Sequence, residues 1–184
     1  MKLTISDLQQ VPDLAEVPED QLQWLLDHGA IITYAAGEHI FQRGDPIDKM
    51  FVVLEGKLNL MVEQNGNYKL IGQIVRHDIS GLLPYSRATT ANGVGEIVQD
   101  TTCLVIYKPQ IREMAMQHYE LTAALVHTMT DRTRGFTRKN VQSEKMMALG
   151  KLSAGLAHEL NNPAAAIARA ARELKKHVDN TPET

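Results

Sequence analysis

The chain has 184 residues, a length that suits one full domain with an appendage or two very small domains. Apolar residues make up 43% of it and charged residues 22%, a balance that excludes wholesale disorder and a fibrous repeat. The formal net charge of -3 argues against a strongly basic nucleic-acid-binding protein. A lone cysteine, Cys103, excludes an intramolecular disulfide and a cysteine-based zinc site. No segment approaches the roughly 20 apolar residues that span a bilayer, and no signal peptide is apparent. We therefore expect a soluble, cytoplasmic protein with no metal and no membrane partner.

The first predicted element is a short helix at residues 19–28. Leu22, Leu25 and Leu26 fall on one side of it, and Gly29 follows as a C-terminal glycine cap. Short apolar runs separated by turn signals come next, and we interpret them as strands at residues 31–34, 39–42, 50–54, 57–63, 68–75, 96–98 and 103–107. Asn65-Gly66-Asn67 is a hairpin signal, because Asn and Gly tolerate positive φ. Seven or eight short strands with tight turns predict a small β-barrel or sandwich, with Cys103 as a small apolar residue of its core.

From Pro109 onward the pattern becomes helical. Pro109 suits the first turn of a helix, and good helix formers dominate the chain from there until the polar residues that begin at Asp179. A helical pattern of this length predicts a coiled coil, and a dimer, because such a helix cannot bury its apolar stripe alone. The predicted organisation is an N-terminal segment (1–18), a barrel domain (19–118), a linker helix (119–143), a second helical segment (144–178) and a polar tail (179–184).

Two stretches of the strand region carry a family resemblance. IFQRGD at residues 40–45 and MFVVLEGKL at residues 50–58 resemble signature stretches of the cyclic-nucleotide-binding domain family. The resemblance covers residues 19–130. It implies an α+β fold, in which a β jelly-roll barrel with flanking helices is followed by a long C-terminal dimerisation helix. Its glycines suit tight turns between strands.

The same resemblance implies a phosphate-binding loop in the stretch SGLLPYSRATT at residues 80–90. Leu82 stands where the family has a glutamate for the ribose hydroxyl, and the family's phosphate-binding arginine corresponds to a position near Gly93. The residues that we expect to bind an anion are Arg87, Ser86, Gly81 and Thr89. A pocket that recognises another ligand and a pocket that binds nothing remain open alternatives to an ordinary cyclic nucleotide site.

The helical region carries a second resemblance. The stretch MALGKLSAGLAHELNNP at residues 147–163 resembles the phosphoacceptor box of sensor histidine kinases. The apolar residues of this region fall on one stripe at about 100° per residue, and His158 lies roughly half a turn away from the centre of that stripe. The resemblance implies that His158 accepts the phosphoryl group, that Glu159 is its acid/base partner and that Asn162 positions water for dephosphorylation of a response regulator. ATP and Mg would bind in a catalytic domain that this chain lacks, so no cofactor is expected in the chain itself.

Three functions follow as hypotheses. The favoured one is the sensor region of a two-component histidine kinase that works as a homodimer, with a response regulator as partner and a nucleotide as a candidate ligand. A DNA-binding regulator of the catabolite-activator type is the rival, in which a basic run would contact phosphates: Arg132, Arg134, Arg138 and Lys139. A dimerisation scaffold with no ligand is the third. Gly135 is a candidate weak point for transmission along the helix.

Overall fold

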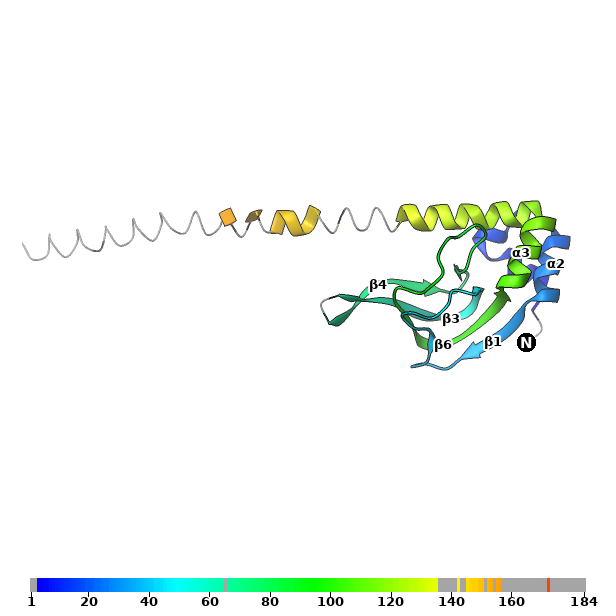
Figure 1. Ribbon diagram of the computed structural model, residues 1–184, viewed down its shortest axis with the longest axis horizontal. Helices are drawn as coiled ribbons and strands as arrows, with labels where there is room; N and C mark the ends of the chain where they lie inside the picture. The colour runs from blue at the N-terminus through cyan, green and yellow to red at the C-terminus, as the bar shows by residue number, and fades with distance from the viewer. Residues whose placement is uncertain are drawn as a thin grey trace, which may run out of the picture. The chain divides into compact units, whose positions relative to one another are not determined.

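The computed structural model describes residues 3–64, 66–135, 142, 145–150, 152–153, 155–156 and 172. They belong to two compact units, Met1–Arg132 and Thr133–Thr184. Figure 1 shows the first unit as a folded sheet, with α2 and α3 at one end of it and a longer helix beside them.

The first unit contains more helix than the sequence predicted. Its helices are α1 (Ile5–Gln9), the 3-10 turn η1 (Pro12–Leu14), α2 (Glu19–His28), α3 (Lys108–Gln117) and most of a helix over residues 119–135, which continues past the last residue of this unit, Arg132. The helix α2 has the predicted bounds. Thr4 caps α1, because its hydroxyl accepts from Asp7 N and the Asp7 carboxylate accepts from Thr4 N at 2.9 Å.

Gly29 ends α2 for a reason other than the predicted one. Its φ of -91° is not left-handed, so no conformational freedom of glycine is used here. A Cβ at this position would lie 2.5 Å from Leu104 Cδ1 and 2.7 Å from the Leu25 carbonyl oxygen. Glycine is therefore required at the end of α2 by space, since the chain passes directly over β6.

Six strands form the antiparallel sheet. They are β1 (Ala30–Tyr34), β2 (His39–Phe41), β3 (Lys49–Gln64), β4 (Asn67–Val75), β5 (Ile79–Gly81) and β6 (Val94–Tyr107). The order is β1-β6-β3-β4, with β2 paired to β6 and β5 paired to β3. The predicted hairpin is confirmed, since Gln64 pairs with Asn67 across Gly66, which has a φ of +79°. The strand β5 was not predicted.

Two pairs of predicted strands are single long strands. Residues 50–54 and 57–63 both belong to β3, and residues 96–98 and 103–107 both belong to β6. The pairing of β3 with β6 is irregular near Gly56, which has a φ of +94°. The hydroxyl of Thr101 on β6 accepts from Lys57 N at 3.0 Å, so the backbone donor at this bulge is satisfied and the strand continues.

The two long strands separate two apolar cores. Successive side chains of a strand point to opposite faces, and both faces of β3 and β6 are buried at their paired ends. One core, which the helices cover, takes Met50 and Leu104, and the other core, inside the barrel, takes Phe51 and Cys103. Cys103 is fully buried, as predicted for a core residue.

The helix over residues 119–135 is separated from α3 at His118, whose φ of -123° and ψ of 90° are not helical. The helix packs on the first core through Leu121 and Leu125, both 0% exposed. Gln21 of α2 holds its first turn, because the Gln21 side-chain carbonyl accepts from Leu121 N at 2.9 Å and its amide donates to the Glu120 carboxylate. The barrel and the helix therefore form one packed body up to Arg132.

The described residues of the second unit are helical, and the apolar ones are exposed. Leu149, Leu152 and Leu156 are 65%, 65% and 59% exposed. Their spacing of three and four residues places them on one face of a helix. This agrees with the predicted apolar stripe, while dimerisation through it stays a prediction.

Candidate ligand-binding loop

The predicted ligand-binding residues lie in and beside the loop that joins β5 to β6, residues 82–93. Gly81 ends β5 with a φ of +85°, and a Cβ there would lie 2.3 Å from the Lys49 carbonyl oxygen. Glycine is required here both by conformation and by the close approach of β3. Gly81 therefore starts the loop against the sheet, and a contact of Gly81 with a ligand stays a prediction.

The first part of the loop enters the protein interior. Leu82 N donates to the Lys49 carbonyl oxygen at 2.8 Å. Leu82 and Leu83 are only 7% and 3% exposed, and both belong to the core that contains Leu125 of the long helix. At the position where the resemblance expects a carboxylate, the chain thus buries an apolar side chain, which offers no acceptor for a ribose hydroxyl.

The middle of the loop is a tight turn on the surface. Ser86 N donates to the Leu83 carbonyl oxygen at 3.1 Å, and the Ser86 hydroxyl accepts from Ala88 N at 3.3 Å. Tyr85 has a φ of +62° and is 73% exposed. A residue other than glycine rarely adopts a positive φ, and those that do are often found at functional sites. The turn presents Arg87, which is exposed and makes no hydrogen bond or ion pair with any residue that the structure describes.

The last part of the loop is fixed by the turn between β2 and β3. The Thr89 carbonyl oxygen accepts from Ile47 N at 2.9 Å, and Ala91 N donates to the Asp45 carbonyl oxygen at 2.9 Å. Gly44, with a φ of +91°, donates to the Ala91 carbonyl oxygen at 2.8 Å. Of these anchoring residues only Thr89 was among the predicted site residues, although the IFQRGD stretch that carries the family resemblance contains Gly44 and Asp45.

The structure leaves no space for an arginine at Gly93, near which the resemblance places the phosphate-binding arginine. A Cβ at Gly93 would lie 2.3 Å from the Met61 carbonyl oxygen of β3. A side chain there would push β3 away from the loop. Within residues 82–93, Arg87 is the one charged residue, so it is the candidate for binding an anion in this loop.

Burial shifts the pKa of two groups in the first unit, Cys103 and Arg132. It raises the pKa of Cys103 to about 12, so that the thiol is protonated at neutral pH and serves as an apolar core group. Burial also lowers the pKa of Arg132 at the end of the long helix, an effect that the Asp78 carboxylate opposes. Asp78 lies in the turn between β4 and β5, where its carboxylate accepts from Val75 N at 2.8 Å.

The predicted phosphoacceptor residues His158, Glu159 and Asn162 lie outside the described residues. Arg138 and Lys139 of the predicted basic run lie outside them as well. In the described part of the chain, no three His, Cys, Asp or Glu side chains gather as metal ligands. No helix among these residues has the length and apolar character to cross a bilayer.

Comparison with known families agrees with this architecture. The family described as "Cyclic nucleotide-binding domain" matches the chain over residues 31–118, from β1 to the end of α3. Residues 31–118 form a cyclic nucleotide-binding domain. The match ends at His118. The phosphoacceptor hypothesis for residues 147–163 therefore depends on the resemblance of that stretch alone.

Solved structures share the fold of this cyclic nucleotide-binding domain. A cyclic nucleotide-binding domain from Methylobacillus flagellatus has a TM-score of 0.66 at 13% identity, and the match covers 76% of this chain and 83% of that one. The catabolite activator protein of Thermus thermophilus has a TM-score of 0.60 at 14% identity, with coverage of 74% and 63%. At these identities the likeness concerns the fold alone.

A curated relative is much longer. Patatin-like phospholipase domain-containing protein 6 of Pongo abelii is 26% identical over 157 residues, which are 82% of this chain and 11% of that protein. The chain thus spans about a tenth of the length of this relative.

Proposed function

We propose that this chain is a regulatory module, in which the loop at residues 82–93 binds a small phosphorylated ligand and the helix at residues 119–135 carries the response. The observation that supports this proposal is the shared core of the loop and the helix. Leu82 and Leu83 of the loop lie in the same apolar cluster as Leu121 and Leu125 of the helix. A ligand that reorders the loop changes the packing under the helix.

The chemistry of the loop favours an anion. Arg87 presents a guanidinium, which pairs with phosphate oxygens in a bidentate manner, and the hydroxyls of Ser86 and Thr89 are nearby in sequence. The loop contains no carboxylate, and Leu82 is buried. The proposed ligand is therefore held mainly through its phosphate, without the ribose contact that the family resemblance implies.

Transmission requires two packings of the helix with different affinities for the ligand. Interiors are close-packed and respond to a shift at one position by switching between discrete arrangements. The side chains of the loop that carry the effect are the apolar Leu82 and Leu83, while Arg87 faces solvent. Binding and transmission thus depend on different residues of one loop and can be separated by mutation.

The test is a thermal-shift titration of the full chain with cyclic AMP, cyclic GMP and cyclic dinucleotides. A ligand at about 100 times its dissociation constant adds about 2.7 kcal/mol of stability. We expect Arg87→Ala to abolish the shift and Arg112→Ala, an exposed arginine of α3, to retain it. The absence of a shift with all of these nucleotides, or a shift that persists in Arg87→Ala, would contradict the proposed site.

For the output, we propose phosphorylation of His158. The supporting observation is the seventeen-residue stretch at 147–163, with its His-Glu pair and its Asn-Pro. A ring nitrogen of His158 attacks the γ-phosphorus of ATP, ADP leaves, and Glu159 accepts the imidazole proton. In the experiment, a separate kinase domain that binds ATP is added in trans. His158→Ala should abolish labelling, whereas His127→Ala, an exposed histidine of the described helix, should not.

A DNA-binding regulator is the second candidate, and the fold likeness to a catabolite activator protein favours it. Arg132, the first residue of the predicted basic run, is half-buried near Asp78 and thus poorly placed for a phosphate contact. Duplex DNA binding with a steep salt dependence would support the regulator. Failure of both DNA binding and labelling would leave the dimerisation scaffold.

A further inference from the structure

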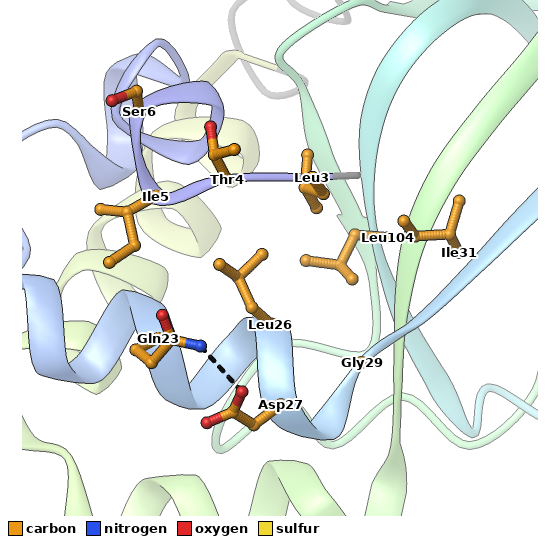
Figure 2. Close-up of a pocket in the computed structure, with 10 residues that line it drawn as sticks. All are labelled: Leu3, Thr4, Ile5, Ser6, Gln23, Leu26, Asp27, Gly29, Ile31 and Leu104. Carbon is orange, nitrogen blue, oxygen red and sulfur yellow. Dashed lines mark hydrogen bonds between the residues drawn. The ribbon is translucent and has the colours of Figure 1, made fainter. Parts of the chain in front are cut away.

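A hollow of about 930 Å³ lies on the outer side of the barrel, between the N-terminal segment, α2 and the start of β1 (Figure 2). This volume is typical of small-molecule sites. The residues that line it are Leu3, Thr4, Ile5, Ser6, Gln23, Leu26, Asp27, Gly29, Ile31 and Leu104. None of them belongs to the loop at residues 82–93, so this hollow is distinct from the proposed nucleotide site.

Five apolar and four polar side chains line the hollow, together with Gly29. Figure 2 shows Leu26, Leu104 and Ile5 directed toward the same space from three different elements. Ile31, at the edge on β1, is 48% exposed. Gly29 lines the hollow with its backbone, since Leu104 Cδ1 and the Leu25 carbonyl oxygen occupy the place of a side chain there. Apolar surface that is accessible in a concave site gains free energy when an apolar group covers it.

The charge at the rim is negative. Asp27 is the one ionisable side chain among the lining residues. Its Oδ1 accepts from Gln23 Nε2 at 2.8 Å, which fixes the carboxylate at the edge of the hollow. Its Oδ2 makes no hydrogen bond with any described residue. A cationic group at the rim is therefore attracted, and an anionic one is repelled.

We propose that this hollow binds an amphiphile that has one apolar chain and a cationic head group. The chain covers Ile5, Leu26 and Ile31, which are partly or well exposed in the hollow, and the head lies beside Asp27. Charge complementarity at the rim selects this occupant over a fatty acid, whose carboxylate would face the Asp27 carboxylate. The occupied surface belongs to α2, whose opposite side holds the first turn of the long helix through Gln21.

The experiment measures binding of decyltrimethylammonium, decanoate and 1-decanol to the full chain by isothermal titration calorimetry, below the micelle concentration of each probe. We expect saturable binding of one molecule of the cation per chain. Decanoate should bind about 2- to 5-fold more weakly than the cation, as is usual for a surface charge pair. Added salt should reduce this difference.

Two pairs of variants separate the apolar and the ionic parts. Asp27→Asn should remove the preference for the cation, while Asp20→Asn, an exposed carboxylate of the same helix, should keep it. Ile31→Trp should fill the hollow and weaken the binding of all three probes about tenfold. Val98→Trp is the control for Ile31→Trp, since Val98 is 45% exposed on β6 and does not line the hollow.

Three outcomes would overturn the proposal: no saturable binding of the cation, equal binding of cation and anion to the wild-type chain, or binding that Ile31→Trp leaves unchanged. Circular dichroism melts of the four variants establish that each is folded, so that a loss of binding is assigned to the hollow.

Discussion

Gly56 allows a quantitative test of how β3 and β6 are packed. Its φ is +94°, and a Cβ added there would lie 2.4 Å from the Asp100 carbonyl oxygen, 2.4 Å from Thr101 Oγ1 and 2.6 Å from Thr101 Cα. Gly56→Ala therefore adds both a left-handed conformation and an overlap with the backbone of the neighbouring strand. Because the atoms in the way belong largely to the backbone, they cannot rotate aside.

Two other glycines separate these contributions. Gly37 has a φ of +89° and nothing within 4 Å of its added Cβ, whereas Gly72 has open space and no positive φ. Gly37→Ala should cost about 1 to 2 kcal/mol, the usual penalty of a left-handed residue. Gly72→Ala should change stability by less than about 1 kcal/mol. Gly56→Ala should cost about 1 to 3 kcal/mol more than Gly37→Ala, since overpacking adds to the conformational penalty.

The assay is urea denaturation of the three variants and the wild type, followed by both circular dichroism and the fluorescence of Trp24. Coincidence of the two transitions is required before free energies are compared. A Gly56→Ala cost equal to that of Gly37→Ala would show that β3 and β6 are not as close at this bulge as described, and would refute the reasoning.

Three further predictions concern other parts of the chain. The buried Cys103 thiol, with a pKa of about 12, should react with a disulfide reagent at pH 8 on the order of 1,000-fold more slowly than in unfolded protein; rapid labelling of the native chain would contradict its burial. The hydrogen bond from Gln21 lowers the pKa of Glu120. The stability that this bond contributes is therefore present above the ordinary glutamate pKa and is lost as the pH falls through the lowered pKa. Gln21→Leu should flatten the acid limb of a stability profile measured by urea melts between about pH 2 and 6. Leu152→Glu should shift the chain to the monomer in analytical ultracentrifugation, whereas Met147→Glu, on the opposite face of the helix, should not. A monomeric wild type would exclude the dimer.

Local signals were sufficient for several elements. The leucine pattern of α2, the Asn-Gly-Asn hairpin and the helix that begins near Pro109 all depend on residues close in the sequence. Family-like stretches were also sufficient for the cyclic nucleotide-binding fold. Such features are determined by periodicity and turn chemistry, which a sequence displays directly.

Long-range packing decided the rest. Residues 50–54 and 57–63 look like separate strands because Glu55-Gly56 is a turn signal, yet they form one strand because Thr101, far along the chain, satisfies the bulge. The burial of Leu82, the lack of space for a side chain at Gly93 and the hollow beside α2 likewise depend on neighbours that are distant in sequence. The sequence by itself determined α2, the β3–β4 hairpin, the start of α3 and the candidate anion-binding arginine. Only the tertiary structure decided how far the strands extend, which side chains are buried and where space is left for a ligand, because contacts between distant residues leave no local pattern.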